Sequence, residues 1–82
     1  MNKLRHEVAK LFVGRAQAQG MKGKKREDAA IEFAVGAAAT VAAIYGQDSP
    51  EWQSMSMLAF FVSLNGYKEM ERFADDATRQ AA

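Results

Sequence analysis

Gly46-Gln47-Asp48-Ser49-Pro50-Glu51 is the strongest break in this chain of 82 residues. Glycine commonly follows the end of a helix, and proline is favoured at the first helical position, where its missing N–H group costs nothing. With Ser49 as the N-cap, Pro50 takes that first position, whereas Asp48 as the N-cap forms a capping box with Glu51. Both alternatives predict that one helix ends near residue 45 and another begins at residue 50.

Upstream of the break, residues 25–45 have the pattern of a helix with apolar side chains on more than one side. Glu27 and Asp28 fall in its first turn, where negative charge suits the helix dipole. Almost no polar side chain follows Glu32, and a helix that is apolar all round is expected to be buried all round. Two helical stripes share this segment: Ile31, Val35, Ala38, Ala42 and Tyr45, and Phe33, Ala37, Thr40, Val41 and Ile44.

Downstream of the break, an apolar stripe continues at helical spacing across the Asn65–Gly66 pair. The stripe comprises Met55, Ala59, Val62, Gly66, Met70, Phe73 and Ala77. Because its phase does not slip, the pattern favours one long helix over residues 50–78, straight or kinked at Gly66. Asn–Gly is also a common helix terminator, so two helices that meet at this pair are the alternative. Within residues 55–64, Ser56 and Ser63 are the only polar side chains.

The remaining segment, residues 3–19, is an ordinary amphipathic helix that ends at Gly20. Leu4, Val8, Leu11 and Phe12 recur at helical spacing on its apolar side. The sequence therefore predicts an all-α fold: a small bundle of three helices, or four if the last one divides at Asn65–Gly66. We expect residues 1–82 to form a single domain, since this length is near the lower limit for one apolar core.

The two central helices carry more apolar surface than three helices of this size can cover. Exposed apolar surface of that extent is uncommon on soluble monomers and is typical of interfaces. We therefore predict a non-enzymatic helical protein-binding module that associates with another protein or with itself as a homo-oligomer. The side chains expected at the interface are Val41, Ile44, Tyr45, Trp52, Met55, Met57, Leu58 and Phe61.

The net charge of +1 conceals a strong asymmetry along the chain. Residues 1–26 hold eight basic side chains and one acidic, whereas residues 27–82 hold three basic and nine acidic. We expect a basic patch, on a flexible connection and the adjoining helix, that contacts an acidic protein or nucleic acid. It comprises Lys3, Lys10, Arg15, Lys22, Lys24, Lys25 and Arg26. Aromatic side chains for stacking on single-stranded bases are not interleaved with this set.

Catalysis and cofactor chemistry have little support in this sequence. The chain has no cysteine and one histidine, and it contains no phosphate-binding or dinucleotide-binding glycine pattern. We expect no metal, no cofactor, no small-molecule substrate and no enzymatic activity, with His6 as an ordinary exposed histidine. No signal peptide is recognisable, and the weakly polar run of residues 33–46 is shorter than the ~20 residues that span a bilayer. We therefore expect a cytoplasmic protein.

Two stretches resemble small uncharacterised helical proteins encoded by bacteriophages. They are Glu32-Phe33-Ala34-Val35-Gly36-Ala37-Ala38 and Leu58-Ala59-Phe60-Phe61-Val62-Ser63-Leu64-Asn65-Gly66-Tyr67, and the resemblance covers roughly residues 30–70. In size and composition the chain is similar to anti-CRISPR and other anti-defence proteins, without a motif of any one family. The resemblance implies a product made in the cytoplasm of a bacterial host, acting as an inhibitor or modulator of a host defence protein by steric occlusion. A nucleic-acid-associated accessory protein and a phage structural or assembly component are the alternatives.

Overall fold

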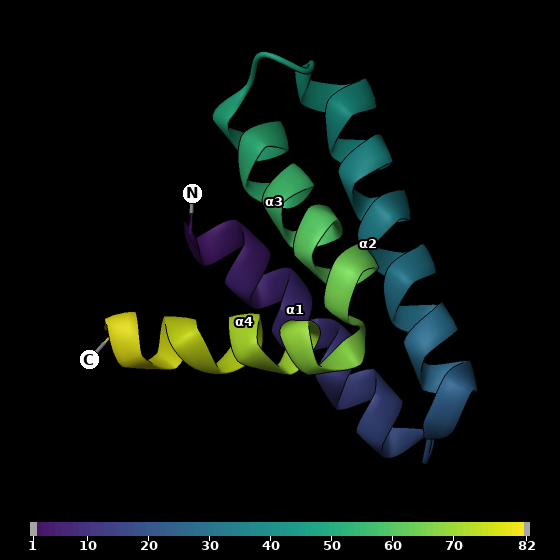
Figure 1. The fold of residues 1–82 in the computed structure, drawn as a ribbon. Helices are drawn as coiled ribbons and strands as arrows, with labels where there is room; N and C mark the ends of the chain where they lie inside the picture. The colour runs from purple at the N-terminus through teal and green to yellow at the C-terminus, as the bar shows by residue number, and fades with distance from the viewer. Residues whose placement is uncertain (1, 82) are drawn as a thin grey trace.

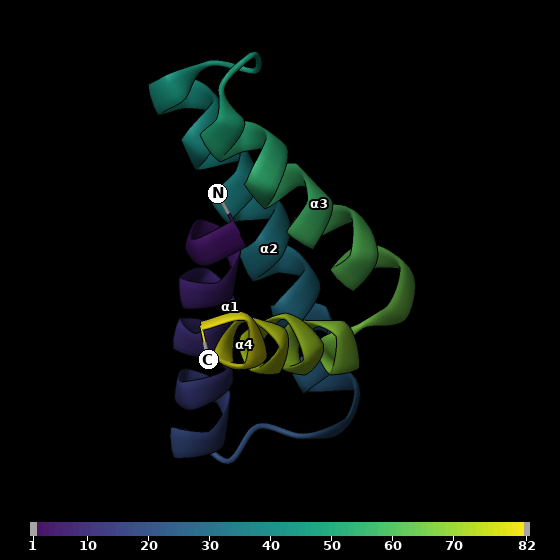
Figure 2. The ribbon, with the colours of Figure 1, turned by 90° about the vertical axis from the view of Figure 1, so that its left-hand side faces the viewer.

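A computed structural model describes the backbone of residues 2–81 and the side chains of residues 3–75. Four helices follow one another: α1 (Asn2–Ala18), α2 (Gly23–Tyr45), α3 (Pro50–Asn65) and α4 (Tyr67–Ala81). No strand occurs in residues 2–81, so the predicted all-α class is confirmed. The helices pack into one small compact body, in which α2 and α3 lie side by side and α4 crosses α1 (Figures 1 and 2).

The break between α2 and α3 matches the sequence prediction. Helix α2 ends at Tyr45, and α3 begins with Pro50 at its first position. Of the two possible N-caps, the structure selects Ser49, whose Oγ accepts the backbone N–H of Trp52 at 3.1 Å. The same hydroxyl donates to the carbonyl oxygen of Gly46 at 2.7 Å, so it ties the end of the turn to its beginning.

Replacing Ser49 by alanine is expected to lower the free energy of unfolding by about 1 kcal/mol. The substitution leaves the N–H of Trp52 without its side-chain acceptor, as for other N-cap serines. Urea denaturation followed by circular dichroism measures the loss. Ser49→Asp keeps an acceptor at the cap and serves as the control, with stability close to that of the wild type. An unchanged midpoint for Ser49→Ala would contradict the assigned cap.

The single long helix predicted for residues 50–78 is wrong. The chain turns at Gly66 with φ +80° and ψ −158°, a conformation that is almost exclusive to glycine. As a result, α4 starts in a new direction at Tyr67 and crosses the middle of α1 instead of extending α3 (Figure 1). The alternative of two helices meeting at Asn65–Gly66 is the one that the structure adopts.

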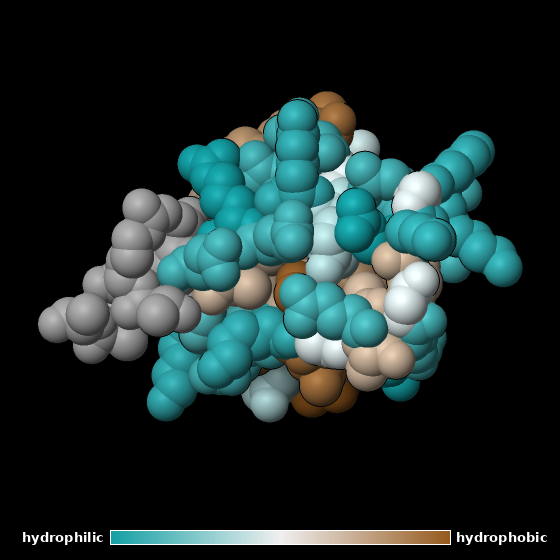
Figure 3. All heavy atoms as spheres, turned by 90° about the horizontal axis from the view of Figure 1, so that it is seen from below, coloured by the Kyte–Doolittle hydropathy of each residue, from teal (hydrophilic) through white to brown (hydrophobic). Residues whose placement is uncertain are grey.

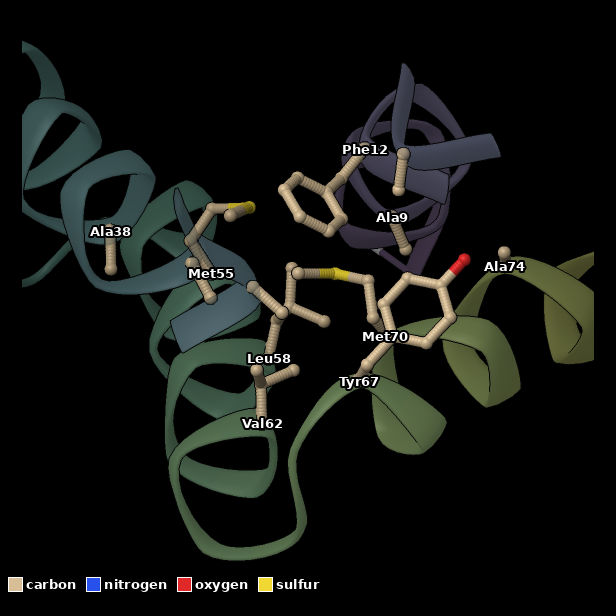
Figure 4. Packing of buried hydrophobic residues seen from close by; sticks show 12 residues of the cluster. Ala9, Phe12, Ala38, Met55, Leu58, Val62, Tyr67, Met70 and Ala74 are labelled. Carbon is tan, nitrogen blue, oxygen red and sulfur yellow. The ribbon is translucent and has the colours of Figure 1, made fainter. Parts of the chain in front are cut away.

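Each helix contributes three side chains to the buried apolar core. Helices α1 and α2 supply mostly alanine, whereas α3 and α4 supply the large side chains that fill the centre (Figure 4). The core comprises Ala9, Phe12 and Ala16 of α1, Ala30, Ala34 and Ala38 of α2, Met55, Leu58 and Val62 of α3, and Tyr67, Met70 and Ala74 of α4.

The core-facing line of α2 coincides with neither predicted stripe. Ala30, Ala34 and Ala38 are spaced four residues apart, and they let the backbone of α2 approach α3 closely. This arrangement leaves Val35 and Ile44, one from each predicted stripe, exposed. The core is therefore asymmetric: small residues of α2 face large residues of α3.

Candidate interaction surface

Seven large apolar side chains among residues 3–75 are exposed. Their exposed fractions range from 44 to 68%. Leu11 lies on α1, Val35, Ile44 and Tyr45 lie on α2, and Met57, Phe60 and Leu64 lie on α3. Six of the seven therefore belong to the α2–α3 pair, which makes this pair the candidate interaction surface.

The outer side of α3 holds the most regular part of this surface. Met57, Phe60 and Leu64 follow one another at intervals of three and four residues, so they form one line along the helix, here called the α3 stripe. Met55, Leu58 and Val62 form a second apolar line on the opposite side and are fully buried. Helix α3 is thus apolar on two opposite sides, of which the fold covers one.

The turn end of α2 forms a second part of the surface. Ile44 and Tyr45 are the last two residues of the helix and are both more than half exposed. They are here called the hairpin tip. Val41 and Trp52 are half-buried, and Val41 packs against the core.

The predicted interface residues divide into three groups. Ile44, Tyr45 and Met57 are exposed, and Val41, Trp52 and Phe61 are half-buried. Met55 and Leu58 were wrong choices, since both are fully buried in the chain's own core and are not accessible to a partner. Phe60 and Leu64 were missed. The local signal for them is the pair Ser56 and Ser63, which lies on the same side of α3 as Phe60 and marks the outward face.

The predicted basic patch does not form one continuous surface. Helix α1 contacts α4 far more than α2, so the first two helices do not pair along their lengths. Residues 23–26 are the first turn of α2 and not a flexible connection, with Lys22 as its N-cap. Six of the predicted residues are exposed: Lys3, Lys10, Arg15, Lys22, Lys24 and Lys25.

Acidic side chains are interleaved with the basic ones at the α1–α2 junction. Lys24 pairs with Asp28 at 3.2 Å, and both side chains are well exposed, so this ion pair adds little stability. An open hollow of about 590 Å³ lies beside the pair and is lined by Lys22, Lys25, Asp28 and Glu32 among others. Seen from below, this end of the molecule is mainly hydrophilic (Figure 3).

Arg26 belongs to a different site, at the turn between α3 and α4. Its guanidinium carbon lies 4.1 Å from the centre of the Tyr67 ring, a close cation–π contact. The neighbouring Glu27 accepts the backbone N–H of Tyr67 through Oε2. Since the N-cap of α4 is Gly66, which has no side chain, Glu27 of α2 supplies the acceptor that a serine or aspartate would otherwise provide. These contacts, the Glu27–Gly66–Tyr67 junction, tie α2 to the start of α4.

Burial raises the pKa of the Tyr67 hydroxyl above 10, with a smaller contribution from the negative charge of Glu71, while the positive charge of Arg26 opposes the shift. The unfolded chain therefore releases this proton at lower pH than the folded chain. The stabilisation from neutral Tyr67 is complete below pH 10 and is expected to decline as the pH rises above it. Thermal unfolding at pH 9 and at pH 11 measures the decline, and Tyr67→Phe, which lacks the hydroxyl, reduces it. An identical pH dependence for the two proteins would contradict the assignment to Tyr67.

His6 is buried, which corrects the expectation of an exposed histidine. It lies between α1 and α4, and its Nδ1 is 3.3 Å from the carbonyl oxygen of Phe73. Because a carbonyl oxygen only accepts, this contact requires the hydrogen on Nδ1. Within residues 3–75, no three histidine, aspartate or glutamate side chains are grouped so as to hold a metal ion. His6 is part of the packed contact between α1 and α4.

Helix α2 also meets the length and composition of a membrane-spanning helix. It has 23 residues, since it begins at Gly23 and is therefore longer than the weakly polar run of residues 33–46. Of its most apolar 18-residue stretch, 17% is buried. The core helix of a soluble protein and a signal sequence meet the same criteria, so these properties by themselves do not assign α2 to a bilayer. The expectation that the protein acts away from membranes stays a prediction.

Comparison of the chain with protein-family models, with curated proteins and with solved structures finds no match. The interpretation of the surface therefore rests on its own geometry and chemistry: two exposed apolar areas on the α2–α3 pair, and basic side chains that are partly paired or dispersed.

Proposed function

We propose that this chain is a helical protein-binding module that acts by covering part of the surface of another protein. The observation that carries the proposal is the set of exposed apolar side chains on the α2–α3 pair, at the hairpin tip and along the α3 stripe. Apolar surface contributes roughly 25 cal/mol per Å² when it leaves water, so its exposure is costly unless a partner covers it. The resemblance to small bacteriophage proteins makes a bacterial host protein the expected partner.

The mechanism requires no chemistry from the module. Ile44 and Tyr45 project from the end of a hairpin whose base is held by the core, so binding would order few additional groups. An aromatic side chain next to an aliphatic one is typical of the residues that dominate binding energy at interfaces. The partner would lose access to whichever of its surfaces the module covers, which is inhibition by steric occlusion.

The nucleic-acid alternative gains less support from the geometry. Lys24 is paired with Asp28, Arg26 stacks on Tyr67, and Lys22 and Lys25 share their hollow with two carboxylates. A phosphate backbone needs uncompensated positive charge along its path. A gel shift with duplex and single-stranded DNA at low and high salt tests this alternative directly, and we expect no shift at either concentration.

The test of the proposed function is affinity capture with matched surface variants. The full chain is immobilised, exposed to lysate of the cell that makes it, and the retained proteins are identified by mass spectrometry. We expect a protein that the wild type retains and that Ile44→Ser or Tyr45→Ser loses, whereas Lys3→Ser, an exposed polar control on α1, retains it. A protein profile that is identical for the wild type and for both tip variants would contradict the proposal.

A further inference from the structure

The α3 stripe has the spacing of a helix–helix seam. Intervals of three and four residues from Met57 to Phe60 to Leu64 reproduce one heptad of the pattern that pairs two helices along their length. All three side chains are exposed, whereas the buried line of the same helix already supplies the core. The stripe is therefore a second seam that the chain's own helices leave uncovered.

The central member of the stripe packs on a half-buried aromatic neighbour. The rings of Phe60 and Phe61 meet edge to face with their centres 5.4 Å apart, and Phe61 lies 6.2 Å from Phe73 of α4. Phe60 is thus an exposed aromatic side chain that is restrained on one side by the ring of Phe61. Such an anchor loses little conformational freedom on binding, so most of the energy from its burial goes into the contact.

Along α3 itself, no charged residue borders the stripe. The other outward-facing residues of α3, Gln53, Ser56 and Ser63, are neutral, and Glu51 in the first turn is the only charged residue of the helix. A partner with charged groups at this position would bury them without complementary charges, which is costly. A second copy of α3 brings no charged residue other than Glu51 in its first turn, and its serines are small enough to let two helices approach closely.

We propose that the α3 stripe is the contact of a homodimer in which two copies of α3 pack across a two-fold axis near Phe60. Such an isologous contact places the same residues on both sides, so Met57, Phe60 and Leu64 of each copy cover those of the other. The inference rests on the proposed function in one respect, since it treats the exposed apolar surface as binding surface. It adds the identity of the occupant: a second copy of this chain.

The size of the contact sets the expected affinity. Seven residues of helix span roughly 10 Å, so two copies bury less area than the ~1,600 Å² of a standard interface. We therefore expect a weak, concentration-dependent dimer with a dissociation constant in the micromolar range. The hairpin tip takes no part in this contact, which leaves it free for another protein.

Sedimentation equilibrium of the full chain, from about 1 μM to about 1 mM, tests the inference over the expected range of affinity. The wild type is expected to change from monomer to dimer across this range. Phe60→Ser removes the central side chain from both copies and should weaken dimerisation by at least about 30-fold. Ile44→Ser is the matched control, since Ile44 is a large and even more exposed apolar residue outside the stripe, and it should leave the dimer unchanged.

Three outcomes would overturn the inference and each differs from a failure of the proposed function. A wild type that stays monomeric throughout the range removes the dimer and leaves binding to another protein intact. Equal weakening by Ile44→Ser moves the contact to the hairpin tip. A monomeric wild type whose captured partner is lost in Phe60→Ser assigns the stripe to that partner. Circular dichroism of both variants establishes that they are folded before the comparison.

Discussion

Gly66→Ala is expected to lower the free energy of unfolding by about 3 kcal/mol. Two separate costs contribute. The backbone at Gly66, with φ +80° and ψ −158°, lies in a region that side-chain-bearing residues almost never adopt. In addition, a Cβ atom at this position would lie 2.7 and 2.8 Å from the two carboxylate oxygens of Glu27, so this side chain must move away and give up its hydrogen bond to the N–H of Tyr67. For a domain whose total stability is roughly 4–12 kcal/mol, this loss is large.

Gly36→Ala is the matched control for this substitution. Gly36 lies in the interior of α2, has no positive φ, and a Cβ there would meet no atom within 4 Å. Alanine is the better helix former, so this variant should gain about 0.5–1 kcal/mol. Urea denaturation of both variants under one set of conditions measures the opposite signs. A Gly66→Ala variant as stable as the wild type would contradict the turn described for residues 65–67.

The contribution of Glu27 is separable by a double-mutant cycle. Glu27→Ala removes the acceptor for the N–H of Tyr67 and is expected to cost about 1 kcal/mol. In the Gly66→Ala background the same change also removes the atoms that collide with the new methyl group. The double variant should therefore be more stable than the sum of the single effects predicts. Strict additivity would show that strain of the backbone, and not the approach of Glu27, accounts for the loss.

This junction explains why the sequence predicted the first helix boundaries better than the last one. The end of α2 and the start of α3 depend on neighbouring residues, namely Gly46, Ser49 and Pro50, whose effects are local. The break at Gly66 also involves Glu27, which is 39 positions away in the chain, because its carboxylate occupies the space beside the glycine and caps the next helix. The uninterrupted apolar phase through Gly66 favoured one long helix, and no local pattern reveals a cap supplied by a distant helix.

The candidate surface was predictable in amount but not in orientation. The surplus of apolar residues in the two central helices follows from the sequence, and the exposed side chains of α2 and α3 agree with it. Which side of α3 faces the core is indicated only by Ser56 and Ser63, because Met55, Leu58 and Val62 are about as apolar as Met57, Phe60 and Leu64. The choice is made by the packing of α2 and α4 against one side, and the apolar residues alone do not reveal that packing.

The orientation of α3 is best tested with two leucines of the same helix. Leu58→Ala is expected to cost about 3 kcal/mol, since Leu58 is fully buried and its truncation leaves a cavity among packed neighbours. Leu64→Ala, in contrast, is expected to cost less than about 0.5 kcal/mol, because Leu64 is 63% exposed and its removal leaves no enclosed void. The two substitutions delete the same atoms, so any difference reflects position alone. Chemical denaturation of the two variants at low micromolar concentration measures it.

The low protein concentration in the denaturation experiment keeps the chain monomeric, which matters because Leu64 is also expected to take part in dimerisation and Leu58 is not. Leu64 belongs to the α3 stripe, so Leu64→Ala should weaken dimerisation while it barely affects the stability of the monomer. Leu58→Ala should destabilise the monomer, and it leaves every side chain of the stripe in place. Equal losses of stability for the two variants would mean that α3 packs with both of its apolar sides, in which case the stripe is core and is not available to a second copy.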